Sequence, residues 1–394
     1  MERFNLLRGI LISACITMLS SLALAFDEVS NTVRTAPATT NASFVFDRSG
    51  VQPLWSLDNK PTLYLVSNSH IDTQWNWTVQ DTIREYVPRT FFDNFKLFEQ
   101  FPNYKFNFEG VIHYMFFKEY HPEAWPTLQD YVARGRWKLA GSWINAIDPN
   151  VPSSESLMRQ ALYGKRFFRR EFGAVSRDIY LPDSFGFPYS LPSIARHSGL
   201  ISFSTQKLRW GSFIPAPFAV GRWEGVDGSS VVAALRGGNY VQDVRSDVST
   251  DRNWNADLTH LGNGKKVGFR YFGVGDMGGA PDATSVQWVE RALSNARAEA
   301  RVLNTSADQL AKDLGPEDYA ALPVYKGELV MKTHGVGCYT SQAAMKNWNR
   351  RNEQLGDAAE RASVAADWLG GSPYQAISCV THGHEFFGIS SMTM

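Results

Sequence analysis

Short apolar runs alternate with amphipathic stretches between Pro61 and about Ala283. Leu63 to Val66 is a continuous apolar run, typical of a strand buried on both faces of a parallel sheet. Comparable runs occur at residues 106–108, 137–140, 179–181, 201–203 and 269–274. Residues 154–172 place Leu157, Ala161, Phe168 and Phe172 on one helical face before the stop signal Gly173. This alternation predicts an α/β domain with helices flanking a mostly parallel sheet or a distorted barrel.

The apolar period changes near Thr340. From Gln342 to Leu369, apolar residues recur every three to four positions, at Trp348, Leu355, Ala359, Ala362, Ala366 and Leu369. This spacing predicts a long amphipathic helix that stops at Gly370, and its Ala-rich face suits packing on other helices. We therefore expect an α/β domain over residues 60–338 and the start of a helical-bundle domain over 339–374. Residues 26–59 read as a linker with a lead-in loop.

The N-terminus has the pattern of a secretory signal. Residues 1–25 have a basic start, an apolar run from Ile10 to Leu24 and small residues at Ala23 and Ala25. We expect cleavage after Ala25 and a secreted or periplasmic protein. The alternative is a lipoprotein, because Ile12 to Cys15 resembles a lipoprotein cleavage box. The apolar run is short for a membrane anchor and no later stretch is apolar enough to span a bilayer, so we expect no transmembrane anchor.

Composition narrows the function classes. Lys and Arg number 39, as do Asp and Glu, so no excess positive charge is available to hold nucleic acid. With 44% hydrophobic and 20% charged residues, the composition is that of a globular protein. Tryptophan is abundant, with 12 residues, and this side chain often lines sugar sites. Once Cys15 leaves with the signal, Cys338 and Cys379 remain as a possible disulfide.

Three acidic motifs directly follow predicted strands: Ser69-His70-Ile71-Asp72, Pro182-Asp183-Ser184 and Gly275-Asp276-Met277-Gly278-Gly279. Loops at the carboxyl ends of parallel strands converge over one face, so we expect the three motifs to share a cavity. His70 and Asp72 are two positions apart on an extended segment, so both side chains can bind one cation. An imidazole nitrogen and a carboxylate oxygen suit Zn²⁺, with Mn²⁺ or Co²⁺ as competitors.

Each motif also has a purely structural interpretation. His70 and Asp72 can form a hydrogen-bonded loop pair, Asp183 can cap a turn, and an Asp in a glycine-rich segment is commonly a turn residue. Their combination at strand ends favours chemistry. Glycoside cleavage needs two carboxyl groups, one ionised to attack the anomeric carbon and one protonated to release the leaving group. A nearby divalent cation would keep the first group ionised by lowering its pKa.

These residues resemble a known family. His70-Ile71-Asp72-Thr73-Gln74-Trp75 is similar to the opening H-x-D-x-x-W motif of the α-mannosidases of glycoside hydrolase family 38. Further similar motifs follow in the same order: Ser154-Glu155-Ser156 with Arg159-Gln160, Leu181 to Gly186, Thr205-Gln206-Lys207-Leu208, Gly275 to Gly279 and Tyr339-Thr340-Ser341-Gln342. They span most of the chain between Leu63 and Leu369.

The resemblance implies a retaining exo-α-mannosidase that removes terminal α-linked mannose from glycans, with one Zn²⁺ in its site. His70, Asp72 and Asp183 match three of the family's metal ligands. Asp183 also matches the nucleophile, Asp276 the general acid/base and Trp75 an aromatic residue under the sugar. In that family the metal coordinates adjacent hydroxyls of the terminal mannose, so mannose-containing glycans are the expected binding partners.

The C-terminal residues depart from the family pattern. The family's fourth ligand is a His in a motif like Q-F-H-D-D, and its members continue with large β-domains. His382 and His384 do not lie in a matching pattern. Codons for Phe387 to Met394, read from their third bases, are compatible with Trp-His-Gln-Phe-His-Asp-Asp. We therefore expect residues 375–394 to be a frameshifted, non-native tail in which Ser391-Met392 occupies the place of the missing ligand.

Two alternatives belong to other function classes. The first is an inactive, C-terminally truncated remnant of such an enzyme, poorly soluble because the apolar side of the 342–369 helix is left exposed. The second is an exported zinc-dependent polysaccharide deacetylase, which can also use a strand-end H-x-D. That enzyme would not need Trp75, Arg159-Gln160 or the Thr205 to Leu208 motif.

Overall fold

The computed structural model describes residues 55–374, apart from 211–215, 334 and 372. The predicted signal peptide, the lipoprotein alternative at Cys15 and the predicted non-native tail with Cys379, His382 and His384 lie outside these residues. Within them, no helix is long and apolar enough to cross a membrane. Cys338 forms no disulfide with any described residue, and its possible pairing with Cys379 stays a prediction.

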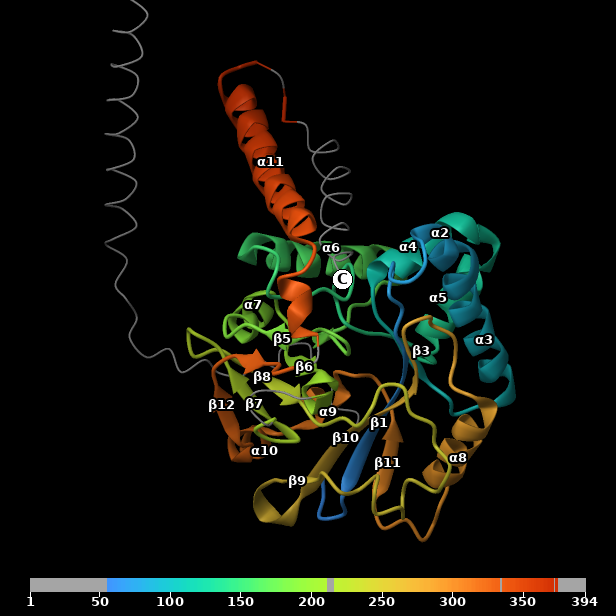
Figure 1. The fold of residues 1–394 in the computed structure, drawn as a ribbon. Coiled ribbons are helices and arrows are strands. Elements are labelled where there is room, and N and C mark those ends of the chain that lie inside the picture. The colour runs from blue at the N-terminus through green and yellow to red at the C-terminus, as the bar shows by residue number, and fades with distance from the viewer. Residues whose placement is uncertain (1–54, 211–215, 334, 372, 375–394) are drawn as a thin grey trace, which may run out of the picture. The chain divides into compact units, whose positions relative to one another are not determined.

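The first sheet is built around strand β1 (Thr62–Ser69), whose eight residues are all buried. β1 pairs in parallel with β10 (Lys266–Val274) along its whole length, and on its other side with β11 (Arg301–Asn304) and then β2 (Phe106–Phe108). β2 continues in parallel to β3 (Trp137–Leu139), whereas β9 (Thr259–His260) is antiparallel to β10. The carboxyl ends of β1 and β10, where the His70 and Asp276 motifs follow, therefore lie side by side (Figure 1).

A second sheet has the strand order β12 (Val324–Lys326), β7 (Val220–Glu224), β8 (Ser230–Ala234), β6 (Ser202–Ser204) and β4 (Asp178–Tyr180). β4, β6 and β8 are parallel, and β7 is antiparallel to β8. A small pair joins β5 (Gly186–Phe187) to β13 (Leu329–Val330). In the described residues the strands form these separate, mostly parallel sheets and close no barrel, so the predicted α/β class is confirmed.

Helices and helical turns connect and cover the strands: α2 (Val79–Asp81), η1 (Thr82–Tyr86), α3 (Val87–Gln100), α4 (Val111–Tyr120), η2 (Pro122–Ala124), α5 (Trp125–Ala133), α6 (Ser154–Phe172), α7 (Leu191–His197), η3 (Lys207–Trp210), η4 (Gly262–Gly264), α8 (Ala283–Leu293), α9 (Gln309–Asp313), α10 (Pro316–Ala321), η5 (Val336–Tyr339) and α11 (Ala343–Trp368). α6 illustrates how the sequence sets such bounds. The Ser153 hydroxyl accepts a hydrogen bond from the Ser156 N–H at its start, and Gly173 ends it with φ 65°.

Aromatic side chains fill the core between the first sheet and helices α3 to α6. Phe91 of α3 stacks on Phe117 of α4 and on Trp137 of β3, with centroid separations of 3.9 and 4.7 Å. The Trp137 indole N–H donates to the Tyr114 hydroxyl, which donates to the Phe108 carbonyl. The packed rings therefore hold β2 and β3 in place beside β1.

The two sheets are joined by a polar contact near the carboxyl ends of their strands. The Tyr180 hydroxyl of β4 donates to the Asn68 side-chain oxygen of β1 over 2.7 Å. The Asn68 amide group donates to the backbone carbonyls of Phe272 and Tyr240. One buried Asn thus fixes β1 against β10, against the loop that follows β8 and against β4.

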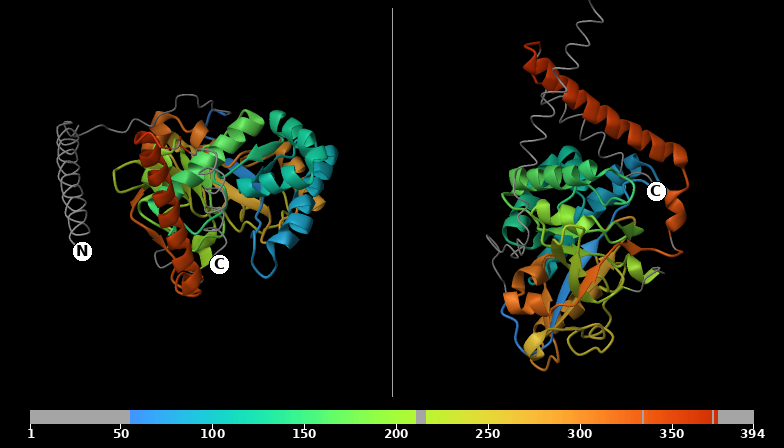
Figure 2. Two further views of the ribbon diagram at one scale, coloured as in Figure 1. Left: turned by 90° about the horizontal axis from the view of Figure 1, so that it is seen from above. Right: turned by 90° about the vertical axis from the view of Figure 1, so that its left-hand side faces the viewer.

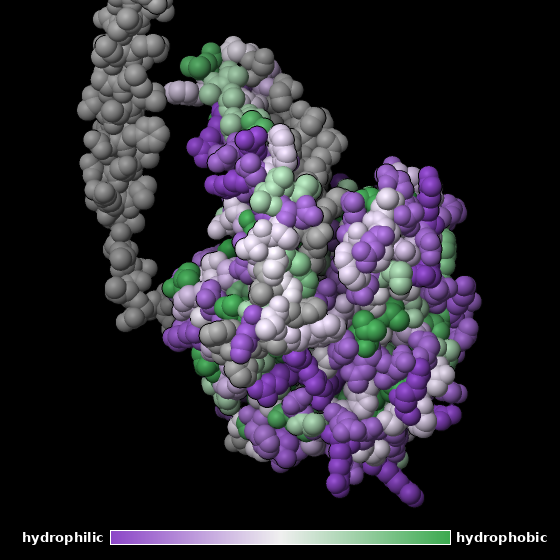
Figure 3. Space-filling view, in the orientation of Figure 1, coloured by the Kyte–Doolittle hydropathy of each residue, from purple (hydrophilic) through white to green (hydrophobic). Residues whose placement is uncertain are grey.

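The long helix α11 follows the two sheets in the chain and lies beside α6 (Figure 2). Glu360 forms a bidentate ion pair with Arg159, and Glu353 accepts hydrogen bonds from the Ser153 N–H and the Ser156 hydroxyl. Several large apolar side chains of this helix are exposed, as predicted: Trp348, Leu355, Val364, Trp368 and, at its end, Leu369. Figure 3 shows such apolar residues interspersed with polar ones on its surface.

Candidate functional site

The carboxyl ends of β1 and β10 hold two of the predicted motifs together. The His70 N–H donates to the Val274 carbonyl over 3.2 Å, and the Asp72 N–H donates to the Asp276 carbonyl over 2.8 Å. In return, the Gly278 N–H donates to the His70 carbonyl. The H-x-D segment and the glycine-rich loop are therefore joined through their backbones.

The glycine-rich loop has a strained and crowded backbone at Asp276. Asp276 has φ 61°, a left-handed conformation that side chains other than Gly adopt at a cost of about 1–3 kcal/mol. A side chain at Gly275 would overlap the ring of Tyr240, and one at Gly278 would overlap Thr90 and Ile71. The absence of side chains at these two glycines lets the loop backbone pack directly against Tyr240, Thr90 and Ile71.

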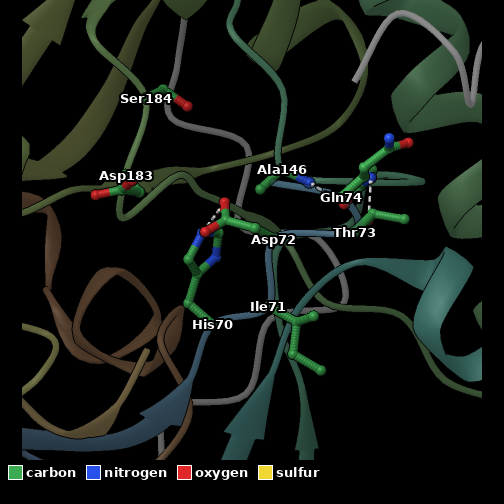
Figure 4. Close-up of a pocket in the computed structure, with 9 residues that line it drawn as sticks. His70, Ile71, Asp72, Thr73, Gln74, Ala146, Asp183 and Ser184 are labelled. Atoms are coloured by element: carbon green, nitrogen blue, oxygen red, sulfur yellow. Dashed lines mark hydrogen bonds and ion pairs between the residues drawn. The ribbon is translucent and has the colours of Figure 1, made fainter. Parts of the chain in front are cut away.

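His70, Asp72 and Asp183 form a cluster of potential metal ligands (Figure 4). One ligand atom from each residue lies within 4.8 Å of those of the other two. The His70 Nε2 atom is buried, makes no hydrogen bond and lies 3.4 Å from a carboxylate oxygen of Asp72. An unpartnered imidazole nitrogen facing two carboxylates has the chemistry of a divalent cation site. The same residues line a pocket with Thr73, Gln74, Asn145 and Ser184.

Glu109 orients the His70 ring. Glu109 follows β2, is 1% exposed, and its carboxylate lies 2.9 Å from the His70 Nδ1 atom. Burial alone would lower the pKa of His70, but the neighbouring carboxylates of Asp72 and Glu109 outweigh it and raise this pKa well above its usual value. The surroundings of the ring therefore stabilise a positive charge beside Nε2, either a proton or a bound cation.

Asp183 reaches the cluster from the second sheet. The Leu181 N–H donates to the Ser204 carbonyl just after β4, and the Ser184 hydroxyl donates to the Ile147 carbonyl. The Lys207 ammonium group, which is buried, is ion-paired with the Asp183 carboxylate. Lys207 belongs to the Thr205 to Leu208 motif, and no role for its side chain was predicted from the sequence.

Tyr240 connects the two predicted catalytic carboxylates. Its hydroxyl lies 2.8 Å from an oxygen of Asp276 and 3.2 Å from an oxygen of Asp183. Burial, together with the charges of both carboxylates, raises the pKa of Tyr240 strongly, so the phenol stays protonated and acts as the donor. Tyr240 and Glu109 were not predicted from the sequence, because neither lies in a motif that carries chemistry by itself.

Trp75 lies at the edge of this arrangement. Its side chain is 53% exposed, and its ring packs edge-on against Trp77 with a centroid separation of 5.8 Å. It is not among the residues that line the pocket beside His70. The structure thus brings His70, Asp72, Asp183 and Asp276 together and leaves Trp75 on the surface, where a role under the sugar stays a prediction.

Residues 60–328 match the N-terminal domain of glycosyl hydrolases family 38. The chain belongs to this family. Similar proteins include alpha-mannosidase G of Dictyostelium discoideum, 33% identical over 299 residues that make up 74% of this chain. Alpha-mannosidase 2C1 of Mus musculus is 33% identical over 305 residues, or 76% of this chain. The chain spans only 26% and 28% of the lengths of these two proteins.

Two solved structures share the fold. An alpha-mannosidase from Enterococcus faecalis V583 superposes with a TM-score of 0.67 at 20% identity, covering 85% of this chain and 39% of that one. A second family 38 protein from Enterococcus faecalis gives a TM-score of 0.57 at 18% identity, covering 82% of this chain and 34% of that one. At these identities the likeness concerns the fold, and it agrees with the α/β class predicted from the sequence.

Proposed function

We propose that this chain carries the catalytic domain of a retaining, zinc-assisted α-mannosidase that acts on terminal α-linked mannose. The observation that carries the proposal is the joining of Asp183 and Asp276 by Tyr240, next to the His70, Asp72 and Asp183 cluster. Family membership supports a glycoside as substrate, and relatives named as α-mannosidases support mannose as the sugar.

In this proposal Asp183 is the nucleophile and Asp276 the general acid/base. Two oxygens of these carboxyl groups both lie within hydrogen-bond distance of the Tyr240 hydroxyl. These two oxygens are therefore no further apart than the sum of the two hydrogen-bond distances. In inverting glycosidases the two carboxyl groups are at least roughly 6.5 Å apart, which is a larger separation. Such a short separation supports direct attack on the anomeric carbon rather than attack through an intervening water.

Zinc fits the donor set of one imidazole nitrogen and two carboxylates. His70, Asp72 and Asp183 would hold it, which would give the unpartnered His70 Nε2 atom a ligand role. When bound, the ion would supply positive charge that keeps Asp183 ionised and polarises hydroxyl groups of the sugar. The Lys207 ammonium group is ion-paired with the Asp183 carboxylate, and the Tyr240 hydroxyl donates a hydrogen bond to the same carboxylate.

The test of the proposal uses the full chain supplied with zinc and an aryl α-mannoside. We expect zinc-dependent release of the phenol, with α-mannose as the first-formed anomer in a proton NMR time course. First-formed β-mannose would contradict retention. A chain that binds zinc but cleaves no mannoside would instead support the inactive-remnant alternative, and release of acetate from an acetylated polysaccharide would support the deacetylase.

Glu109→Gln should weaken zinc binding by about 10- to 100-fold, because the glutamine amide cannot supply the charge that fixes the His70 ring. Competition with a chromogenic chelator measures this affinity without requiring catalysis. Asp313→Asn is the matched control. Asp313, at the end of α9, is also buried, but its carboxylate accepts a hydrogen bond from the Tyr64 hydroxyl of β1 and not from a residue of the metal-ligand cluster. Equal zinc affinity in wild type and Glu109→Gln would show that Glu109 does not orient a metal ligand.

Asp276→Ala should slow substrates with poor leaving groups by about 10²- to 10⁴-fold, because only these need a proton from the enzyme. Activated aryl mannosides should lose far less in the glycosylation step. The kcat/KM values of the variant on dinitrophenyl and methyl α-mannosides measure the contrast. A similar loss on both substrates would assign the proton transfer to another carboxyl group.

A further inference from the structure

An open pocket of about 620 Å³ lies beside the proposed catalytic residues and is not part of the metal-ligand cluster. Its lining includes Arg209, Trp210, Asn239, Gln242, Asp257 and Arg270. The Lys207 ammonium group lies 4.7 Å from the centre of the Trp210 ring and is ion-paired with Asp183. Trp210 and the proposed nucleophile thus contact the same ammonium group, so the Trp210 wall of the pocket lies near Asp183.

The loop that carries Tyr240 forms another wall of this pocket. Tyr240 reaches the catalytic carboxylates, while Asn239 and Gln242 on either side of it line the pocket. The side-chain oxygen of Asn239 accepts the Val241 N–H, and that of Gln242 accepts the Asn239 N–H. Because the oxygen of each amide accepts one of these bonds, the other end of each amide is its NH₂ group. The NH₂ groups of Asn239 and Gln242 donate to no group in the described part of the chain.

Two guanidinium groups add further unused donors. The Arg209 side chain is exposed and makes no hydrogen bond or ion pair with the residues that the structure describes. Arg270 is 7% exposed and donates through Nε and one terminal nitrogen to the Trp254 and Asn253 carbonyls. Its other terminal nitrogen, Nη1, lies near Gly238 without a hydrogen bond to any described residue.

The charge of the lining is positive. Asp257 is the acidic side chain in the lining, and its carboxylate lies 3.2 Å from Arg270, so it neutralises one guanidinium. Arg209 has no such partner among the residues that the structure describes. Burial lowers the pKa of Arg270 and the charge of Arg209 acts in the same direction, against the effect of Asp257, so the two guanidinium groups interact electrostatically. Unpaired donors with net positive charge match a ligand rich in oxygen acceptors and negatively charged.

We propose that this pocket binds an anionic group, a carboxylate or a phosphate, on the leaving-group side of the substrate. The inference rests on the proposed function, because that function places the scissile bond of a mannoside at Asp183 and Asp276. Trp210 supplies an aromatic face for the body of the leaving group, and Arg209 pairs with its charge. The preferred substrates are then mannosides whose second component is acidic.

The test compares two mannosides of nearly equal shape, 4-carboxyphenyl and 4-carbamoylphenyl α-D-mannopyranoside, on the zinc-supplied full chain. Arg209→Met should lower kcat/KM about tenfold for the carboxylate and less than twofold for the amide, because only the former loses a charge-assisted hydrogen bond. Taking the ratio of variant to wild type for each substrate cancels their different intrinsic reactivities. Arg297→Met, a change at an exposed arginine outside the pocket lining, should alter neither ratio.

Titration calorimetry with the same two mannosides separates this inference from the proposed function. Selective, Arg209-dependent binding of the carboxylate without cleavage would support the pocket and contradict the catalytic proposal. Cleavage of both mannosides with equal losses in Arg209→Met, or with none, would keep the catalytic proposal and overturn the pocket. Binding of neither mannoside, or binding that ignores Arg209, would also overturn it.

Discussion

Asp183→Asn should abolish hydrolysis of an aryl α-mannoside, with a loss of at least about 10⁴-fold in kcat. The proposal gives Asp183 two tasks, attack on the anomeric carbon and binding of zinc beside His70 and Asp72. An amide is a far weaker nucleophile than a carboxylate, and it also removes one negative charge from the cation site. Stopped assays with nitrophenyl α-mannoside and excess zinc measure the loss. Residual activity above about a hundredth of wild type would contradict the assignment.

Asp178→Asn is the matched control for Asp183→Asn. Asp178 is a buried carboxyl group on β4, the strand that leads to Asp183, and it accepts a hydrogen bond from the Gly141 N–H. Burial, with the charge of Asp308, raises the pKa of Asp178 to about 7, so an asparagine resembles a form this residue already adopts near neutral pH. We expect this variant to fold and to keep its activity within a few-fold.

Phe91→Ala should lower the free energy of unfolding by about 3–5 kcal/mol, the range for a large aromatic side chain removed from a packed core. Phe91 is fully buried and stacks on both Phe117 and Trp137. Removing it leaves a cavity beneath β2 and β3, and β2 leads into Glu109. Chemical denaturation followed by tryptophan fluorescence measures the loss, and the zinc affinity of the variant should fall as Glu109 loses its support.

The neighbouring residue supplies the control for Phe91→Ala. Phe92 is only partly buried at the side of the same cluster, so Phe92→Ala should cost clearly less than Phe91→Ala. Equal losses for the two variants would show that the stacked rings around Phe91 do not form the centre of this core.

The sequence was most informative where local signals and burial agree. The helix over residues 154–172 was predicted with its observed bounds, because an apolar face runs along it and Gly173 ends it; the structure adds the cap from Ser153. The predicted apolar runs coincide with β1, β2, β3, β4, β6 and β10 to within a few residues, since an apolar run bounded by polar residues has few other uses, whereas β7, β8 and β11 were not predicted. The strand-end motifs then followed from the general geometry of parallel sheets.

Sheet partners and single supporting residues were not predictable in this way. The β7 and β8 pair forms through long-range contacts, and nothing local in residues 220–234 shows that they join β6 and β12. Glu109 and Tyr240 each look like an ordinary residue of an apolar or glycine-rich stretch. Their importance depends on the fold, which brings Glu109 to the back of His70 and Tyr240 to both carboxylates.

The central claim is that Asp183 attacks a mannoside in a zinc-loaded site, and covalent trapping tests it most directly. The zinc-supplied full chain is incubated with 5-fluoro-mannosyl fluoride, and the labelled peptide is identified by mass spectrometry. We predict one fluoromannosyl group per chain, carried by Asp183 and absent when zinc is removed by a chelator. A label on Asp276 or any other carboxylate, or no label on a chain that has bound zinc, would contradict the account.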